Sequence, residues 1–201
     1  MVVDMSHTSG VEHTHAITTV GVVGTGRLGT AVARLALEAG YPTYVTGRDT
    51  PINAMIVETT LPGAHWVTPA ELWKHADAVI LAIPQEALHT LDPTPGTLLI
   101  DATNAWDDAP EVNVPELFPN NPVVKTLNHT TYSELHTEAH LGRAMGVAGA
   151  EEYAVAVDKL ISDMGFDPVR APARALTPGQ PFFGRRFTAE EFALALESYV
   201  H

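Results

Sequence analysis

Residues 19–29 read TVGVVGTGRLG, a β-branched run that enters glycines spaced as GxGxxG. The run Thr19 to Val23 predicts a buried strand, and Arg27 to Ala39 predicts a helix that Gly40 ends. In such a strand–turn–helix, the first glycine permits the tight turn, the second lets a diphosphate approach the backbone, and the third lets helix and strand pack closely. Unpaired N–H groups and the dipole at the helix start favour phosphate. The motif therefore predicts a dinucleotide site at Gly24, Thr25, Gly26, Arg27 and Leu28.

The rest of the chain alternates strand-like and helix-like segments, the order typical of parallel strands joined by crossover helices. Further strands are predicted at residues 43–46, 65–67, 78–83, 97–102, 123–127, 145–148 and, as a final edge strand, 168–170. Further helices are predicted at residues 69–75, 85–91, 151–164 and 188–200, and residues 106–121 are predicted to be mostly loop with one short helix. The predicted fold class is α/β: a doubly wound, mostly parallel Rossmann sheet with a small C-terminal extension.

The length of 201 residues allows one sizeable domain and a small appendage. Residues 1–16 are polar and lack periodicity, so we expect a flexible N-terminal tail. Residues 17–170 contain the whole strand and helix alternation and form the predicted Rossmann domain. Residues 171–201 begin with a segment rich in Pro, Gly and Arg and predict a small C-terminal lobe with a terminal helix.

Net charge, apolar runs and cysteine content limit which molecules this protein is expected to bind. The chain has 11 Lys plus Arg against 24 Asp plus Glu, a formal net charge of −13, which disfavours nucleic acids and anionic membrane surfaces as partners. No apolar run approaches the roughly 20 residues that span a bilayer, and a secretory signal pattern is not evident. With no cysteine, thiolate metal sites and disulfides are excluded. We expect a cytoplasmic protein that acts on a small-molecule redox substrate.

The end of the second strand predicts which dinucleotide is bound. An NAD-preferring domain usually carries Asp or Glu about twenty residues after the motif, for the ribose 2′-hydroxyl. This chain instead has Gly47 and Arg48, and a guanidinium suits a 2′-phosphate. The pattern favours NADP over NAD; the alternative is a solvated surface arginine.

Three segments follow strands at the edge where ligands of parallel sheets bind. Ile83 and Pro84 are predicted to press on the nicotinamide, and Asn104 follows the next strand. The substrate-binding residues are predicted to be Asn128, His129 and Thr130. For each residue a purely structural role is an equal alternative: Pro84 could end its strand, Asn104 could serve a turn, and His129 could belong to a helix start.

Catalytic and metal-ligating patterns are sparse, and we assign no catalytic residue and no metal ligand. Neither a Ser-His-Asp arrangement nor HExxH is evident, and His136 and His140 have the i, i+4 spacing of zinc ligands without a third candidate. Hydride exchange between two cofactors asks the protein mainly for proximity and orientation. The sparse inventory fits such a reaction.

Several segments together resemble the NADPH-dependent F420 oxidoreductase family, over roughly residues 18–178. They are residues 20–29 with Arg48, 78–84, 101–104, 123–128 and 165–169. The resemblance implies a compact Rossmann domain that binds NADP, with a small C-terminal lobe that helps seat the deazaflavin F420, or FMN or FAD in relatives. It also implies that residues 25–28 contact the pyrophosphate, Gly47 and Arg48 the 2′-phosphate, and residues 128–130 the acceptor ring.

The leading hypothesis is an NADP(H)-dependent oxidoreductase that transfers a hydride between NADPH and F420 or a flavin. One alternative is a reductase of a small carbonyl or imine substrate, although such enzymes usually have a long helical dimerisation domain that this chain lacks. Another is a redox sensor that binds NADPH without turnover. We expect a homodimer, because so short a chain would use a partner's surface to close its acceptor site.

Overall fold

The structure is a computed structural model that describes residues 15–48, 50–106 and 109–200. Most of the predicted tail, residues 1–14, lies outside the described residues. The strands are β1 (Val20–Val23), β2 (Thr43–Thr46), β3 (His65–Trp66), β4 (Ala78–Leu81), β5 (Leu98–Asp101), β6 (Val123–Lys125), β7 (Ala144–Val147) and β8 (Asp167–Arg170). The α-helices are α1 (Arg27–Glu38), α2 (Pro51–Thr60), α3 (Pro69–His75), α4 (Val114–Leu117), α5 (Tyr132–Thr137), α6 (Glu151–Asp163) and α7 (Ala189–Val200), and the 3-10 helices are η1 (Gln85–Thr90) and η2 (Ala173–Leu176).

Six strands form one parallel sheet in the order β3-β2-β1-β4-β5-β6. The chain runs outward from β1 through β2 to β3 and then returns to β4 on the other side of β1. The strand order therefore reverses between β1 and β4, where ligands of doubly wound sheets bind. The predicted α/β Rossmann fold is confirmed.

Apolar strands are buried from both sides, as expected for a parallel sheet covered by helices. One core cluster joins the sheet to α1, α2 and α6, and a second joins its opposite face to α3, η1 and α4. Val22 and Ile80 belong to the first cluster, and Val79 and Leu81 to the second. Adjacent residues of β4 thus point to opposite faces, which fixes the strand register.

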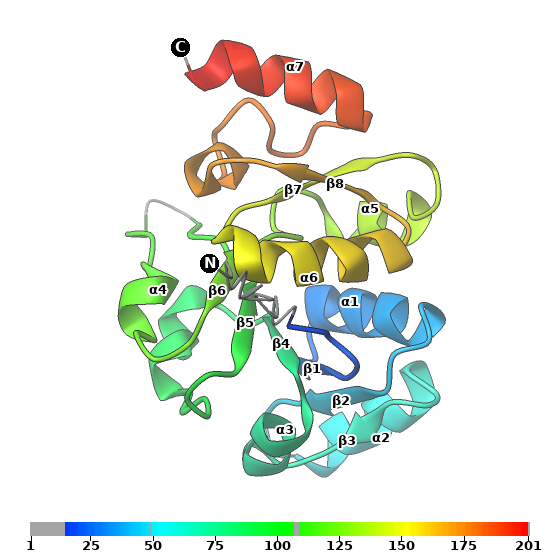
Figure 1. Cartoon of the computed structure of the whole chain (residues 1–201). Coiled ribbons are helices and arrows are strands. Elements are labelled where there is room, and N and C mark those ends of the chain that lie inside the picture. The colour runs from blue at the N-terminus through cyan, green and yellow to red at the C-terminus, as the bar shows by residue number, and fades with distance from the viewer. Residues whose placement is uncertain (1–14, 49, 107–108, 201) are drawn as a thin grey trace, which may run out of the picture.

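The C-terminal part forms a further layer. Strands β7 and β8 pair with each other in a separate parallel sheet, which touches the main sheet through an antiparallel bridge between Lys125 and Ala148. The final edge strand predicted at residues 168–170 is present as β8, but it pairs with β7 in this second sheet rather than with the main sheet. Figure 1 shows β7 and β8 between α6 and α7, and Phe182, Phe192 and Leu196 belong to the core cluster below α7.

Other differences from the predicted elements are local. Helix α2 was not predicted, and the segment after β4 is a 3-10 helix, η1, rather than an α-helix. Among the described residues, no helix combines the length and apolar character that crossing a membrane requires.

Candidate functional site

The glycine-rich turn places each of its three glycines under a different constraint. Gly24 has φ +117°, and a Cβ there would lie 2.3 Å from the carbonyl oxygen of Ala82 on the β4 side. A Cβ on Gly29 would lie 2.0 Å from the carbonyl oxygen of Gly24. Gly26, in contrast, would present its Cβ to open space, with no atom within 4 Å. Two glycines thus let β1, β4 and α1 pack closely, and Gly26 leaves the backbone accessible from outside.

The start of α1 has the properties of an anion site. Gly26 is its N-cap and supplies no side-chain hydrogen bond, and the first turn contains no acidic residue. The backbone N–H groups of the first turn have no partner within a helix, and the helix dipole places partial positive charge there. These N–H groups, beside the open space at Gly26, fit the diphosphate of a dinucleotide, as the sequence predicts.

The end of β2 reaches the same turn. A Cβ on Gly47 would lie 3.1 Å from the Oγ1 atom of Thr25, so the two residues are neighbours. Arg48 follows on the exposed surface, and its carbonyl oxygen accepts hydrogen bonds from Thr50 N–H and from the side-chain amide of Asn53. Within the described residues no carboxylate lies within 4.0 Å of the Arg48 guanidinium. The predicted 2′-phosphate contacts are thus adjacent to the predicted pyrophosphate contacts.

A cleft of about 470 Å³ opens at the point where the strand order reverses. It brings together seven predicted site residues: Gly26, Arg27, Leu28, Ile83, Pro84, Asn128 and Thr130. The remaining lining residues follow three strands, β4, β5 and β6, or belong to the C-terminal lobe: Ala82, Ala102, Thr103, Asn104, Trp106, Leu127, Thr131, Tyr132 and Phe183. Segments from across the chain therefore converge on one mainly apolar cleft beside the glycine-rich turn.

His129 does not line this cleft. Its side chain is buried, its Nε2 atom accepts a hydrogen bond from Gly146 N–H at 2.9 Å, and its ring lies 5.7 Å from that of Phe192. Burial, reinforced by the charge of Arg143, lowers the pKa of His129 to about 4. The ring is therefore neutral at pH 7, and its hydrogen bond requires an unprotonated Nε2. We correct the expected acceptor contact of His129 to a structural role between β7 and the C-terminal lobe.

Asn104 and Asn128 form a reciprocal pair at the back of the cleft. Asn104 Nδ2 donates to the carbonyl oxygen of Asn128 at 2.7 Å, and Asn128 Nδ2 donates to Asn104 Oδ1 at 2.9 Å. Asn128 Nδ2 also donates to the carbonyl oxygen of Leu176 in η2. Leu127, just before, has φ +64°, a strained value for a residue other than glycine. The amide pair thus holds the loops after β5 and β6 against the C-terminal lobe.

A buried ion pair lies behind these loops. Lys125 Nζ lies 2.9 Å from Asp101 Oδ2 and also donates to the carbonyl oxygen of Thr103. Asp101 Oδ1 accepts hydrogen bonds from the backbone N–H and the hydroxyl of Thr103. Gln85 Nε2 donates to the Thr103 hydroxyl, and Gln85 Oε1 accepts from Val112 N–H. The network fixes the position of Thr103 at the cleft wall.

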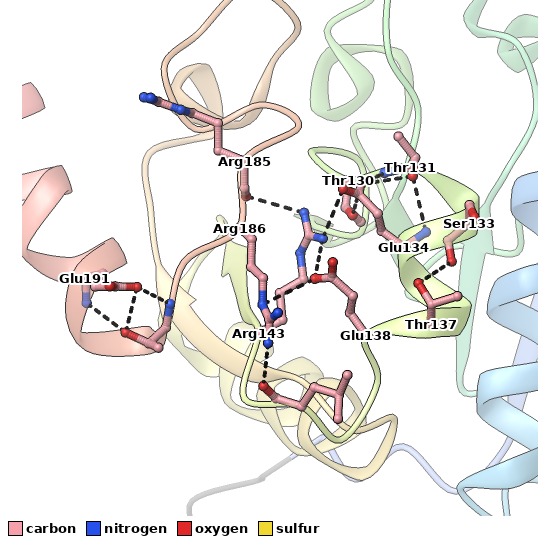
Figure 2. Close-up of polar contacts among 12 residues, drawn as sticks. Thr130, Thr131, Ser133, Glu134, Thr137, Glu138, Arg143, Arg185, Arg186 and Glu191 are labelled. Carbon is pink, nitrogen blue, oxygen red and sulfur yellow. Dashed lines mark hydrogen bonds and ion pairs between the residues drawn. The ribbon is translucent and has the colours of Figure 1, made fainter.

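Helix α5 is held in place by a second buried cation. Arg143 is fully buried, and its Nη1 atom lies 2.7 Å from Glu138 and 3.5 Å from Glu134 (Figure 2). Its Nη2 atom donates to the carbonyl oxygen of Arg185 in the C-terminal lobe. A capping box between Thr131 and Glu134 begins the helix. These contacts orient α5, whose first residue lines the cleft.

Three aromatic residues at the cleft were not predicted. Trp106 is 58% exposed and packs edge-to-face on Phe183, with ring centroids 5.7 Å apart. Tyr132 Oη accepts a hydrogen bond from Arg27 Nη1 at 3.1 Å. Phe183 is 77 residues from Trp106 in the sequence (183 − 106), so only the tertiary fold brings them together. A tryptophan at the start of a predicted loop was the one signal that the sequence offered.

Comparisons with known proteins agree with this geometry. A family model described as "D-isomer specific 2-hydroxyacid dehydrogenase, NAD binding domain" matches residues 5–91, less than half of the chain. No curated protein matches the sequence. Residues 5–91 are thus similar to an NAD-binding domain in the part that holds the glycine-rich turn and the end of β2.

Solved structures share the fold. A hypothetical protein from Sinorhizobium meliloti is 25% identical with a TM-score of 0.74, over 85% of this chain and 95% of that one. A protein from Arthrobacter sp. FB24, provisionally described as an F420-dependent NADP reductase, is 20% identical with a TM-score of 0.63, over 80% and 87%. An imine reductase from Aspergillus terreus, solved with NADPH4, is 16% identical with a TM-score of 0.62, over 92% of this chain and 62% of that one. The class that emerges is a Rossmann-type α/β fold whose first part, residues 5–91, is similar to an NAD-binding domain.

Proposed function

We propose that this protein is an NADP(H)-dependent oxidoreductase that transfers a hydride between NADPH and F420 or a flavin. The observation that carries the proposal is the mainly apolar cleft, which lies next to the diphosphate-binding turn where the strand order reverses. The nicotinamide supplies the hydride chemistry, and the protein contributes binding and orientation.

On the cofactor side, the backbone N–H groups at the start of α1 bind the diphosphate, and Arg48 binds the 2′-phosphate through its guanidinium. Ile83 and Pro84, which follow β4, form one wall of the cleft and press on one face of the nicotinamide. That contact leaves the opposite face directed toward the acceptor. Burial between the wall and the loops after β5 and β6 excludes water from the reacting face.

On the acceptor side, the cleft offers mainly apolar surface, and Tyr132 is the one proton-donating phenol among the described residues that line it. Among the described residues that line it, none is Asp, Glu, His or Lys. Trp106 and Phe183 supply aromatic surface for a planar ring, while Asn128 and Thr130 supply polar contacts. A conjugated ring acceptor needs proximity and alignment more than a general acid. This inventory favours F420, FMN or FAD over a substrate whose oxygen must be protonated.

The test is to mix the purified protein with NADPH and each of F420, FMN and FAD, and to follow nicotinamide absorbance. We expect turnover with at least one of these acceptors and none with a variant that cannot bind the cofactor. Tight NADPH binding without turnover on any acceptor would contradict the proposal and favour the redox-sensor alternative.

A second candidate function is the reduction of a small carbonyl or imine compound. Tyr132 favours it, because a phenol that accepts a hydrogen bond from a guanidinium can donate its own proton into the cleft. Tyr132→Phe distinguishes the two functions: it should abolish reduction of a carbonyl or imine and leave reduction of a ring acceptor largely unchanged.

We also propose a homodimer, in which a partner's surface covers the exposed side of the cleft where Trp106 lies. Light scattering coupled to size-exclusion chromatography tests this directly. A monomer at working concentration, with full activity, would contradict it.

A further inference from the structure

A second cavity, of about 590 Å³, lies between α1 and α5 and adjoins the cleft. Its lining residues are Thr25, Gly26, Arg27, Thr30, Ala31, Arg34, Tyr132, Ser133 and His136. Gly26, Arg27 and Tyr132 line both cavities, so the second begins where the cleft ends. We refer to the second cavity as the α1–α5 groove.

The lining of the α1–α5 groove has the chemistry of an anion site. Arg27 and Arg34 are seven residues apart on α1, two turns of one helix face, and His136 comes from α5 on the opposite side. Thr30 and Ser133 are hydroxyl-bearing residues in the same lining, and no described lining residue is acidic. The two guanidinium groups thus stand together in a chain whose formal net charge is −13.

Neither arginine is neutralised within the described residues. Arg27 donates to the Tyr132 hydroxyl, and Arg34 Nη2 donates to the carbonyl oxygen of Thr60, both at 3.1 Å. A guanidinium has five N–H donors, so most remain available to a ligand. The carboxylate of Glu134 on α5 is paired instead with the buried Arg143 (Figure 2).

The groove also extends beyond the reach of the diphosphate. Arg34 is eight residues after the N-cap Gly26, about 12 Å along the helix at 1.5 Å per residue. The dinucleotide diphosphate contacts the first turn only. Arg34 is therefore available to an anionic group other than the diphosphate.

We propose that the α1–α5 groove binds an anionic side arm, a phosphate or carboxylate, of the hydride acceptor whose ring occupies the cleft. The proposal rests on the proposed function and deepens it: the acceptor is a planar ring with a negatively charged arm, and Arg34 selects for that arm. Bidentate hydrogen bonding suits the arginine fork to either oxyanion.

The test compares matched ligands that differ only in the arm: FMN with riboflavin, and F420 with its phosphate-free deazaflavin. Equilibrium affinity for the NADP-saturated protein is measured by ligand fluorescence, so the readout does not require turnover. At least one anionic ligand should bind about tenfold more tightly than its neutral counterpart, as expected for one charge-assisted contact. Arg34→Ala should reduce this ratio to near one and leave the neutral ligand's affinity unchanged.

Arg185→Ala is the matched control, because it removes the same charge from a side chain that points away from α5 in Figure 2. It should preserve the ratio. A second experiment tests whether the groove prefers free phosphate. If inorganic phosphate at millimolar concentration displaces neither FMN nor F420, the groove recognises the side arm as part of the acceptor.

The proposal is overturned if neither anionic ligand binds more tightly than its neutral counterpart, if Arg34→Ala weakens both members of a pair equally, or if Arg185→Ala has the same effect. Failure of the proposed function is a separate result. It would appear as absent turnover while the arm-dependent affinity and its loss in Arg34→Ala persist.

Discussion

At the scale of single residues, Gly26 and Gly29 have different roles: Gly29 is needed for packing, and Gly26 is needed for cofactor binding. An added Cβ on Gly29 would meet a backbone oxygen, whereas one on Gly26 would meet nothing. We predict that Gly29→Ala lowers the free energy of unfolding by about 1–3 kcal/mol or more, the usual cost of overpacking. Gly26→Ala should keep wild-type stability and lose NADPH affinity by more than about tenfold, since the methyl group occupies the approach of the diphosphate. Urea denaturation and a binding titration measure both; a stable Gly29→Ala that binds normally would contradict this division.

At the same scale, Arg48 is predicted to determine the preference for NADPH over NADH. Arg48→Ala should weaken NADPH about 10–100-fold, because a charge-assisted contact is worth about 1.5–3 kcal/mol. NADH should lose little, since it lacks the 2′-phosphate. Arg48→Lys, which keeps a charge but not the fork, should fall between the two. Equal weakening of both coenzymes in parallel titrations would remove Arg48 from the site.

At the scale of elements, the Lys125–Asp101 pair joins β6 to β5. Lys125→Met should cost about 3–5 kcal/mol of stability, because the Asp101 carboxylate stays buried without its cation. The matched control is Lys159→Met, which breaks the exposed pair with Asp163 and should cost at most about 1 kcal/mol. Chemical denaturation measures the free energy of unfolding of both variants. Similar decreases in the two would show that the buried pair does not contribute more to stability than the exposed pair.

The contact between β7 and the loop after β6 is predicted to be sensitive to acid through His129. Its pKa is about 4 in the folded state, below its ordinary value of 6.5, so the unfolded chain binds the proton first as pH falls. Neutral His129 therefore contributes about 3 kcal/mol to the free energy of unfolding above pH 6.5. This contribution decreases as the pH falls from 6.5 towards 4. His129→Gln should reduce this part of the loss, whereas the exposed His136→Gln should leave it unchanged. Identical pH profiles for all three proteins would contradict the assignment.

Most elements could be predicted from the sequence because their signals are local. The apolar run of β4, the glycine-rich turn and the capping box at Thr68 and Glu71 each specify their own structure. Helix α2 lacks such a signal, since Ile52, Met55 and Ile56 are exposed and do not form a buried stripe. Only its cap at Thr50 and the following proline indicated a helix start.

At the scale of the whole molecule, the cleft depends on contacts that sequence patterns do not encode. The strand ends at Ile83 and Asn128 were predictable from the position of parallel strands, because their carboxyl ends meet at one edge. The pairing of β7 with β8, the inward turn of His129 and the approach of Phe183 to Trp106 all depend on how the C-terminal lobe packs. These features are long-range, and no local pattern predicts them.

The central claim is that the start of α1 and the end of β2 together bind NADPH. Isothermal titration of the folded protein with NADPH and NADH tests it most directly. We predict saturable binding of NADPH, tighter than that of NADH by tenfold or more, as one charge-assisted phosphate contact would give. Absence of detectable binding for both coenzymes, or a clear preference for NADH, would contradict the account.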